Sequence, residues 1–481
     1  MHIGKQFRTT RGTGRTAMAI AIGLAVSTGV WAQDQAGSGA SDDALFGAEE
    51  VTEAAPAAEA PQASFLKYDQ VKVGGSISGS LGGSAVWLDP WNAGLGTVDD
   101  HYLSPGLSAK VTLTAKPAED FGVNLDFRMS YPFSTTTTVA SGKIDDPLTL
   151  YIDESRKNAD IPNISVWAAY AKFSLWNSVF MSFGKQPIAW GVSKGFFQPA
   201  DDIFAMSVVD YSDTGAEREG PLAFKAMIPI PLTMANVYFY AGLPSTDYTA
   251  FGNLRVAAKA EVNVGNTEIA IGGFYAYNDY PRGLLMVTTG TGDFNFFGEG
   301  VLKYGSERYF IDTKGSSNPM LWTATQDPDR FYFSGTLGGY YTDSNANLTI
   351  MAQVLYNGEG QTGVTAQEAY AYYYALGHLD QADRMKLNAW YAGASISKSK
   401  LFTEDLSAGV YAIADLSDLS AFVSPYVAYS FSDYMSVKLS AIFTLGEAGD
   451  EYILMGPDFR HAATEPGTAV SLTFTLGSGS F

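Results

Sequence analysis

The residues that most often carry out enzyme chemistry are scarce in this chain. The sequence has no cysteine and four histidines. A His–Ser pair acting from one strand would need a spacing of two, because alternate side chains of a strand share a face. The spacing of His101 and Ser104 is odd, and a zinc site needs three or four ligands close together. We therefore expect no catalytic residue, no metal and no cofactor.

Lysine and arginine form a larger set with a possible role, because they recur at the polar positions of alternating segments. Basic side chains around a water-filled pore favour anions, whereas acidic ones favour cations. Bases outnumber acids here, so we expect a weak anion preference; no strong preference, or a cation preference set by acidic outer loops, remains open. The residues expected to line the pore are Lys72, Lys110, Arg128, Asp126, Lys172, Lys225, Arg255, Lys259, Glu261, Glu299, Lys303, Lys386 and Lys438.

A two-residue alternation of apolar and polar side chains positions these groups. In segment 107–116, every second residue from Leu107 is apolar and the residues between are Ser, Thr or Lys. Such alternation is typical of a strand with one apolar and one polar face. Roughly ten to twelve residues, tilted near 45°, span a membrane core of about 25 Å. Every backbone group must be paired in hydrocarbon, so the sheet has to close.

The pattern thus predicts an all-β fold: a transmembrane, antiparallel, up-and-down β-barrel of about 16–18 strands with short periplasmic turns and long extracellular loops. Region 284–304 leaves the count open. A soluble β-sandwich also alternates, but segment 435–445 is long for one. The segments expected as strands are 70–88, 107–116, 121–131, 164–175, 179–190, 221–229, 234–243, 253–264, 267–277, 284–289, 294–304, 331–342, 348–357, 385–396, 401–415, 421–431, 435–445 and 468–476.

Aromatic residues gather near the ends of these segments. Tyr and Phe are abundant, at 28 and 29 residues, and both suit the interface between membrane and water. We expect two interfacial girdles, formed by Trp87, Tyr131, Trp176, Trp190, Tyr240, Tyr277, Phe331, Tyr356, Phe431 and Tyr434.

The N-terminus has the features of an export signal. Four basic residues precede an apolar run over 17–30, and a small-x-small site places cleavage between Ala32 and Gln33. The run is shorter than the roughly 18–20 residues that a spanning helix needs. We expect a signal peptide over 1–32, a disordered acidic Ala/Pro-rich periplasmic segment over 33–68, and the barrel over 69–481.

Charge narrows the range of partners. The formal net charge is −20, which argues against binding nucleic acid through its phosphates. An apolar exterior and a polar interior make outer-membrane lipid and small hydrophilic solutes the expected partners.

The stretch 184–221 resembles bacterial outer-membrane porins. Gly-Lys-Gln at 184–186 and Trp-Gly at 190–191 end one strand, and Pro-Ala-Asp-Asp at 199–202 follows in the next loop. In porins such a loop folds toward the pore, so the resemblance implies a constriction. Lys185 shares the lipid-facing parity of Phe183, and a bulge near Gly184 or Pro187 would be needed to turn it inward. The constriction candidates are Lys185, Gln186, Trp190, Asp201, Asp202 and Arg218, with a girdle position as the alternative for Trp190.

These observations predict a porin-like channel of the bacterial outer membrane for passive diffusion of small hydrophilic solutes, and not an enzyme. The terminal aromatic Phe481 resembles the signal by which the barrel-assembly machinery recognises its clients. The channel is expected as a monomer or trimer. Two alternatives remain: a fatty-acid-type transporter of hydrophobic solutes, which needs a plug and an apolar interior, and a surface adhesin or structural barrel that acts through its loops.

Overall fold

The computed structural model describes most of the predicted barrel. It covers residues 71–478, with gaps at 97, 132, 134–135, 138–155, 158–161, 177, 208, 212–213, 215–217, 232, 244–252, 278, 317, 362–368, 370–371, 374–385, 459–462 and 464. The predicted signal peptide with its Ala32–Gln33 cleavage site, the segment 33–68 and Phe481 lie outside the described residues. In the part described, no helix is long and apolar enough to cross a membrane.

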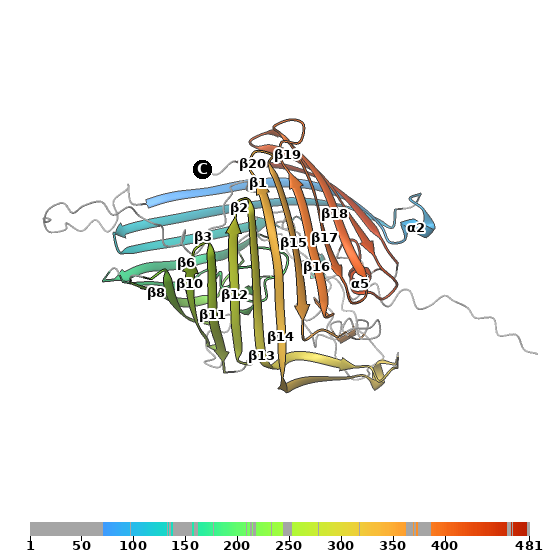
Figure 1. The fold of residues 1–481 in the computed structure, drawn as a ribbon. Helices are drawn as coiled ribbons and strands as arrows, with labels where there is room; N and C mark the ends of the chain where they lie inside the picture. The colour runs from blue at the N-terminus through green and yellow to red at the C-terminus, as the bar shows by residue number, and fades with distance from the viewer. Residues whose placement is uncertain are drawn as a thin grey trace, which may run out of the picture.

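Eighteen strands form one closed antiparallel sheet, which confirms the predicted barrel and the larger of the two strand counts. Each strand pairs with the next along the barrel, and β1 pairs with β20 from Ile77–Ser478 to Trp87–Thr468. In Figure 1 the blue first strands adjoin the red last strands. The strands are β1 (Val71–Trp87), β2 (Asp100–Ala118), β3 (Phe121–Tyr131), β6 (Asn163–Leu175), β7 (Val179–Lys185), β8 (Leu222–Ile230), β9 (Ala235–Leu243), β10 (Arg255–Val264), β11 (Thr267–Ala276), β12 (Arg282–Thr291), β13 (Phe294–Asp312), β14 (Thr323–Asp343), β15 (Leu348–Asn357), β16 (Trp390–Lys398), β17 (Leu406–Asp415), β18 (Ser420–Ser432), β19 (Met435–Leu445) and β20 (Thr468–Ser478).

Short elements occur in the connections between these strands. The pair β4 (Thr136–Thr137) and β5 (Arg156–Lys157) forms a separate two-stranded sheet. The helices with described bounds are α2 (Pro90–Ala93) and α5 (Glu451–Met455), and the 3₁₀ turns with described bounds are η2 (Asp201–Ile203) and η4 (Pro319–Leu321). Both η2 and α5 follow strands of the barrel and bring charged residues to its lumen, as described below.

The two faces of the sheet differ as the alternation predicts. Leu337 on β14 is 73% exposed, while its neighbour Thr336 is 2% exposed. The same contrast holds on β7 between exposed Phe183 and buried Ser182. The exterior is therefore apolar, and polar residues occupy inward positions on these strands, which is the arrangement of a barrel that spans a membrane.

Girdle aromatics have to face outward, and the girdle prediction is wrong at two positions. Trp176 and Tyr277 stand out from the barrel, at 86% and 77% exposure. Trp190 and Tyr240 are instead buried inside, at 0% and 2%. The reason is that β7 ends at Lys185, so Trp190 belongs to the loop beyond it. Tyr240 lies on the inward parity of β9.

The hairpin of β13 and β14 extends beyond the strands predicted there. Both strands continue into the region expected as a loop over 305–330, with register shifts after Tyr304 and after Ser306. Gly305 has φ +87°, a conformation that favours glycine, and it lies at the first shift. The outer, yellow part of the hairpin turns sideways from the barrel strands (Figure 1). Its Ile311 and Trp322 pack with Leu387.

The start of β16 also differs from prediction. It begins at Trp390 and not at 385, so Lys386 lies in the preceding connection with φ +58°. The pore-lining prediction for Lys386 assumes that it lies in a strand, so the alternation of β16 does not determine where its side chain points.

A charge on the outer face should disrupt the barrel, whereas the same charge one position away should not. Leu81 faces outward on β1 and Ser80 faces inward. Leu81→Arg is expected to destabilise membrane-inserted protein by about 2–4 kcal/mol, the usual effect of arginine at the bilayer midplane. Ser80→Arg should leave stability nearly unchanged. Urea titration of refolded protein in lipid vesicles measures both, and equal destabilisation would contradict the assigned orientation.

Candidate functional site

The connection from β7 to β8, residues 186–221, folds into the barrel and is called the inward loop here. Its Trp190, Phe196, Phe197 and Phe204 are each at most 1% exposed. The ring of Trp190 lies 4.6 Å from that of Tyr240, between centroids. Two apolar clusters join the loop to the inward faces of β8–β13 and of β15–β18. The inward loop therefore fills part of the lumen and is packed like a protein core.

Two inward-facing wall residues anchor the backbone of the inward loop. The Glu299 carboxylate on β13 accepts hydrogen bonds from the N–H groups of Val192, Ser193 and Ala200 at 3.1, 3.2 and 3.3 Å. The Gln353 amide on β15 accepts from the Phe197 N–H at 3.1 Å and donates to the Phe197 carbonyl at 2.6 Å. Both side chains are buried, so these bonds are shielded from water and strong.

One wall glycine makes room for the inward loop. Gly393 lies on β16, and a Cβ atom there would overlap the ring of Phe196. A side chain at this position would push Phe196 away from the wall. The absence of a side chain at Gly393 thus allows the inward loop to pack closely against β16.

Three constriction candidates support the inward loop from within. One Asp201 carboxylate oxygen accepts from the backbone N–H groups of Trp190 and Gly191 at 2.5 and 2.6 Å. Gln186 accepts from the Ser182 hydroxyl at 2.5 Å and donates to the Ala223 carbonyl at 2.9 Å. Gln186 and Trp190 are buried. Asp201, Gln186 and Trp190 therefore stabilise the inward loop from beneath its surface.

Two other candidates form a charged cluster that water can reach, called the Asp202 cluster here. Arg218 donates to one Asp202 oxygen at 2.8 Å, and Lys386 donates to the other at 2.7 Å. Burial raises the pKa of Asp202, but Lys386 and Arg218 more than offset this and lower it below its ordinary value. One carboxylate therefore stands between two cations, which leaves a net positive charge.

Lys185 lies at the end of β7, apart from the Asp202 cluster. The pairing of β6 with β7 runs without a register shift from Leu175–Val179 to Ala169–Lys185. Lys185 thus keeps the parity of exposed Phe183, and its ammonium forms an ion pair with Glu219. The bulge that would turn it inward is not present in this pairing.

Several predicted pore-lining residues lie beneath the inward loop. Lys225 and Lys259 are both 5% exposed. Lys259 pairs with Glu261 at 3.2 Å, and Lys225 lies over the aromatic rings of β9. Arg255 donates to the Ile203 carbonyl of the loop at 2.9 Å. On this side of the barrel, basic residues hold the loop and their neighbours more than they face water.

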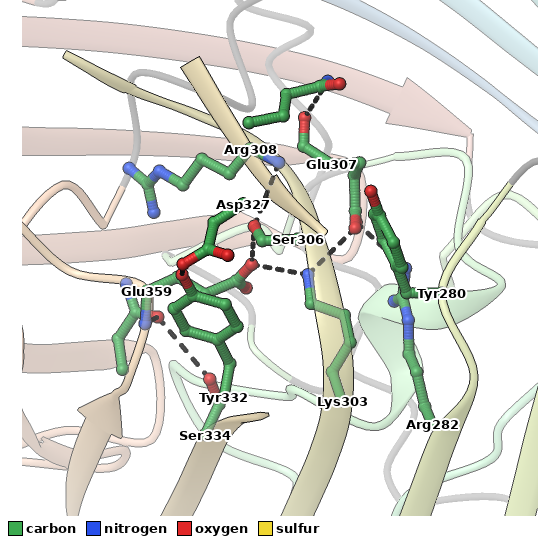
Figure 2. A network of polar contacts seen from close by, with 12 residues as sticks. Tyr280, Arg282, Lys303, Ser306, Glu307, Arg308, Asp327, Tyr332, Ser334 and Glu359 are labelled. Carbon is green, nitrogen blue, oxygen red and sulfur yellow. Dashed lines mark hydrogen bonds and ion pairs between the residues drawn. The ribbon is translucent and has the colours of Figure 1, made fainter. Parts of the chain in front are cut away.

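Lys303 belongs to a polar network at the outer ends of β12–β14 (Figure 2). Its ammonium lies 3.0 Å from Glu307 and 2.6 Å from Glu359. Arg282 pairs with Glu307 at 3.0 Å and with Asp279 at 2.8 Å. Three acidic groups thus surround the two positive charges of Lys303 and Arg282, and the network ties the base of the long hairpin to the barrel.

The opposite wall carries the predicted lining residues that remain in contact with water. Asp126 pairs with Arg128 at 3.3 Å and with Lys110 at 3.8 Å, and the Lys110 side chain is 40% exposed. Around them, β1, β2, β19 and β20 present small, partly exposed hydroxyl residues such as Ser80 and Thr473. The other predicted residues on inward parity here are Lys72, Lys172 and Lys438.

Sequence reasoning misses the uncharged and loop-borne parts of this site. Gln353 is neutral, and a search for charges passes over it. The useful signal is bulk: Met351, Gln353 and Leu355 are too large for the open inner wall of a water-filled pore, and each contacts the inward loop or its apolar cluster. Asp210 and Glu451 lie in connections between strands, where the alternation does not predict which way a side chain points.

Glu451, at the start of α5, is a buried acid in the mouth of the barrel. It accepts from the Tyr391 hydroxyl at 2.6 Å and from the N–H groups of Lys386 and Leu387 at 3.1 and 3.2 Å. Burial raises its pKa to about 8, helped by neighbouring acidic groups, although the hydrogen bond from Tyr391 acts in the opposite direction. The folded protein therefore holds this proton more tightly than the unfolded chain, whose carboxyl has the ordinary pKa of 4.5.

This shift predicts that α5 loosens as the pH rises. Stability from a carboxyl with a raised pKa is fully present at low pH and is lost between the ordinary value of 4.5 and about 8. Hydrogen exchange over 451–455, corrected for its intrinsic pH dependence, should speed up across that window by up to about tenfold per pH unit. Glu451→Gln should remove the dependence. An identical pH profile in both proteins would contradict the prediction.

Comparisons with known proteins give no family assignment. No family model matches the chain, and no curated protein matches it. Among solved structures it is similar to Acinetobacter baumannii OccAB1 (12% identity, TM-score 0.47, covering 86% of this chain and 97% of that one). It is also similar to Pseudomonas aeruginosa OccK8 (OprE) (9% identity, TM-score 0.47, 86% and 99%) and to Salmonella typhi OmpF (9% identity, TM-score 0.39, 85% and 99%). At this level of similarity the assignment of the fold rests on the strand pairing of the chain itself.

Proposed function

We propose that this chain is a porin-like channel of the bacterial outer membrane, through which small hydrophilic solutes diffuse passively. The observation that carries the proposal is a closed 18-stranded barrel with an apolar exterior and a partly water-exposed polar inner wall. A barrel of 16–18 strands encloses an aqueous channel. The inward loop takes up most of the lumen beside β8–β18, so the passage runs mainly along β19, β20, β1, β2 and β3.

In this proposal the Asp202 cluster marks the narrow part of the channel. Its three charged groups are reached by water and stand on the inward loop and the connection before β16. Asp201, Gln186 and Trp190 hold the loop that carries the cluster. A weak anion preference is supported by the net positive charge of the cluster and by the two bases that share Asp126.

A transporter for hydrophobic solutes is less well supported. The large apolar side chains of the interior, such as Phe196 and Phe204, are packed against the wall and are about 1% exposed. The inner surface that remains accessible is made of hydroxyl and charged groups. We further propose export by the predicted signal peptide, insertion by the barrel-assembly machinery, and function as a monomer or trimer.

Single-channel recording in planar lipid bilayers tests the proposal. Folded, full-length protein should produce discrete conductance steps in potassium chloride, and a salt gradient should give a reversal potential of anion sign. Leu81→Arg serves as a control for folding, since poorly inserted protein should give few steps. Heat-modifiable, folded wild-type protein that produces no steps would end the channel proposal.

A further inference from the structure

A small hollow opens in the inner wall where β17–β20 meet the lumen. Its volume is about 90 Å³, and we call it the Lys438 pocket. Its polar lining consists of Tyr411, Ser424, Tyr426, Lys438, Ser440 and Ser471. All six lie on the inward parity of their strands, so the pocket faces the proposed passage.

The ammonium of Lys438 is placed to receive a negative charge. It lies 4.8 Å from the ring centroid of Tyr426, and the ring fixes its position. Among the described residues, no acidic group forms an ion pair with it. Asp210 of the inward loop acts on both Lys438 and Tyr411 electrostatically, but it is not among the residues that line the pocket.

Hydroxyl groups continue from the pocket around the wall at one level. Tyr426 pairs with Ser440, Ser440 with Ser471, and Ser471 with Ser84, on four successive strands. The Ser84 and Ser471 hydroxyls lie 2.8 Å apart. A ligand at Lys438 therefore has hydroxyl donors and acceptors within reach on the side away from the loop.

We propose that the Lys438 pocket binds the carboxylate end of a small polyhydroxylated acid, which rests on the proposed channel function. The carboxylate pairs with Lys438 and accepts from the Tyr426 hydroxyl. The hydroxyls of the solute exchange hydrogen bonds with Ser440 and Ser471. A solute with both kinds of group satisfies the cation and the row of hydroxyls together.

The size of the pocket limits what enters it. Its volume of about 90 Å³ is well below the roughly 300–1,000 Å³ of ordinary ligand pockets, so it takes the carboxyl end of a solute and not a whole six-carbon chain. The rest of a longer solute stays in the passage along the hydroxyl row. This geometry separates three probes of equal chain length: D-gluconate has carboxylate and hydroxyls, sorbitol has hydroxyls only, and hexanoate has a carboxylate only.

Isothermal titration calorimetry of the full-length protein in detergent, with these three probes, tests the pocket. D-gluconate should bind at least about tenfold more tightly than sorbitol or hexanoate, because each lacks one set of hydrogen-bond partners. Equal affinity for gluconate and hexanoate, or no heat with gluconate, would overturn the proposal.

Two variants assign the binding to the named groups. Lys438→Gln should weaken gluconate binding by about tenfold or more, the usual effect of losing a charge-assisted hydrogen bond. Tyr426→Phe keeps the ring under the ammonium and removes only the hydroxyl, so a loss of about threefold is expected. Lys400→Gln makes the same charge change at the turn after β16 and should bind like the wild type. Unchanged binding in Lys438→Gln, or equal losses in Lys438→Gln and Lys400→Gln, would refute the assignment.

Conductance recorded on the same preparations separates this proposal from the proposed function. Gluconate should interrupt the wild-type potassium chloride current and should do so less in Lys438→Gln. A channel that conducts but does not bind gluconate would refute the pocket alone. Gluconate binding by a protein that does not conduct would refute the channel and leave the pocket standing.

Discussion

Replacing Glu299 with alanine is expected to release the inward loop and to increase the single-channel conductance. The Glu299 carboxylate holds three backbone N–H groups of the loop, within 3.1–3.3 Å. Without the carboxyl group these three N–H groups lose their acceptor, and a buried donor left unpaired costs about 1–3 kcal/mol, so the substitution should cost about 3 kcal/mol or more of loop docking. That is a change of more than about 100-fold in the docking equilibrium. Planar-bilayer recording should show larger and more variable steps, and hydrogen exchange over 188–204 should accelerate.

Two companion variants make the Glu299 experiment specific. Glu299→Gln keeps the shape and one acceptor oxygen, and should give an intermediate phenotype. Glu404→Ala removes a carboxyl group from the exposed turn before β17 and should conduct like the wild type. Wild-type conductance in Glu299→Ala would mean that the loop stays in place without its anchor, and the anchoring role would be wrong.

Changing the Asp202 cluster should move ion selectivity in opposite directions. The cluster holds one carboxylate between two cations. Asp202→Asn leaves both cations unbalanced and should favour anions; Lys386→Gln leaves a neutral pair and should favour cations. One unit charge acts on an ion about 5 Å away in water with about 0.8 kcal/mol, or about fourfold in local concentration. Reversal potentials under a salt gradient measure both shifts, and shifts of the same sign would contradict the assignment.

Acidification offers an independent check on Asp202. Its pKa lies below the ordinary value of 3.8 because Lys386 and Arg218 outweigh the effect of burial. A lowered pKa means that the stability from this cluster is present above 3.8 and is lost only as the pH falls through the lower, folded value. The difference in reversal potential between the wild type and Asp202→Asn should therefore stay constant down to about pH 4. A wild-type reversal potential that approaches that of Asp202→Asn above this pH would refute the pairing.

Alternation predicts the barrel well because the two faces of each strand meet opposite environments. The apolar residues of 435–445 have to face lipid, so their parity alone determines that Lys438 points inward. Strand number follows from counting such segments, up to the ambiguity over 284–304, which contains parts of both β12 and β13.

The interior of the loops cannot be predicted in the same way. Nothing in the local sequence of 186–221 says that Glu299, about a hundred residues further on, holds its backbone. An aromatic residue at a strand end usually lies in a girdle, which is why a girdle position is an expectation for Trp190. Its true position depends on Tyr240 and on the room made by the wall, which are long-range features. The alternation also does not predict the orientation of Lys386, because the strand β16 begins only at Trp390 and does not include it.

The anchoring of the inward loop inside a ring closed by the seam of β1 and β20 has a consequence for assembly. The inward loop is held by β13 and β15 and lies inside the ring that this seam completes. The anchors follow the loop in the chain, so the loop cannot take its final position until β13 and β15 have joined the sheet. Until then Phe196 and Phe197 lack the part of the wall against which they pack.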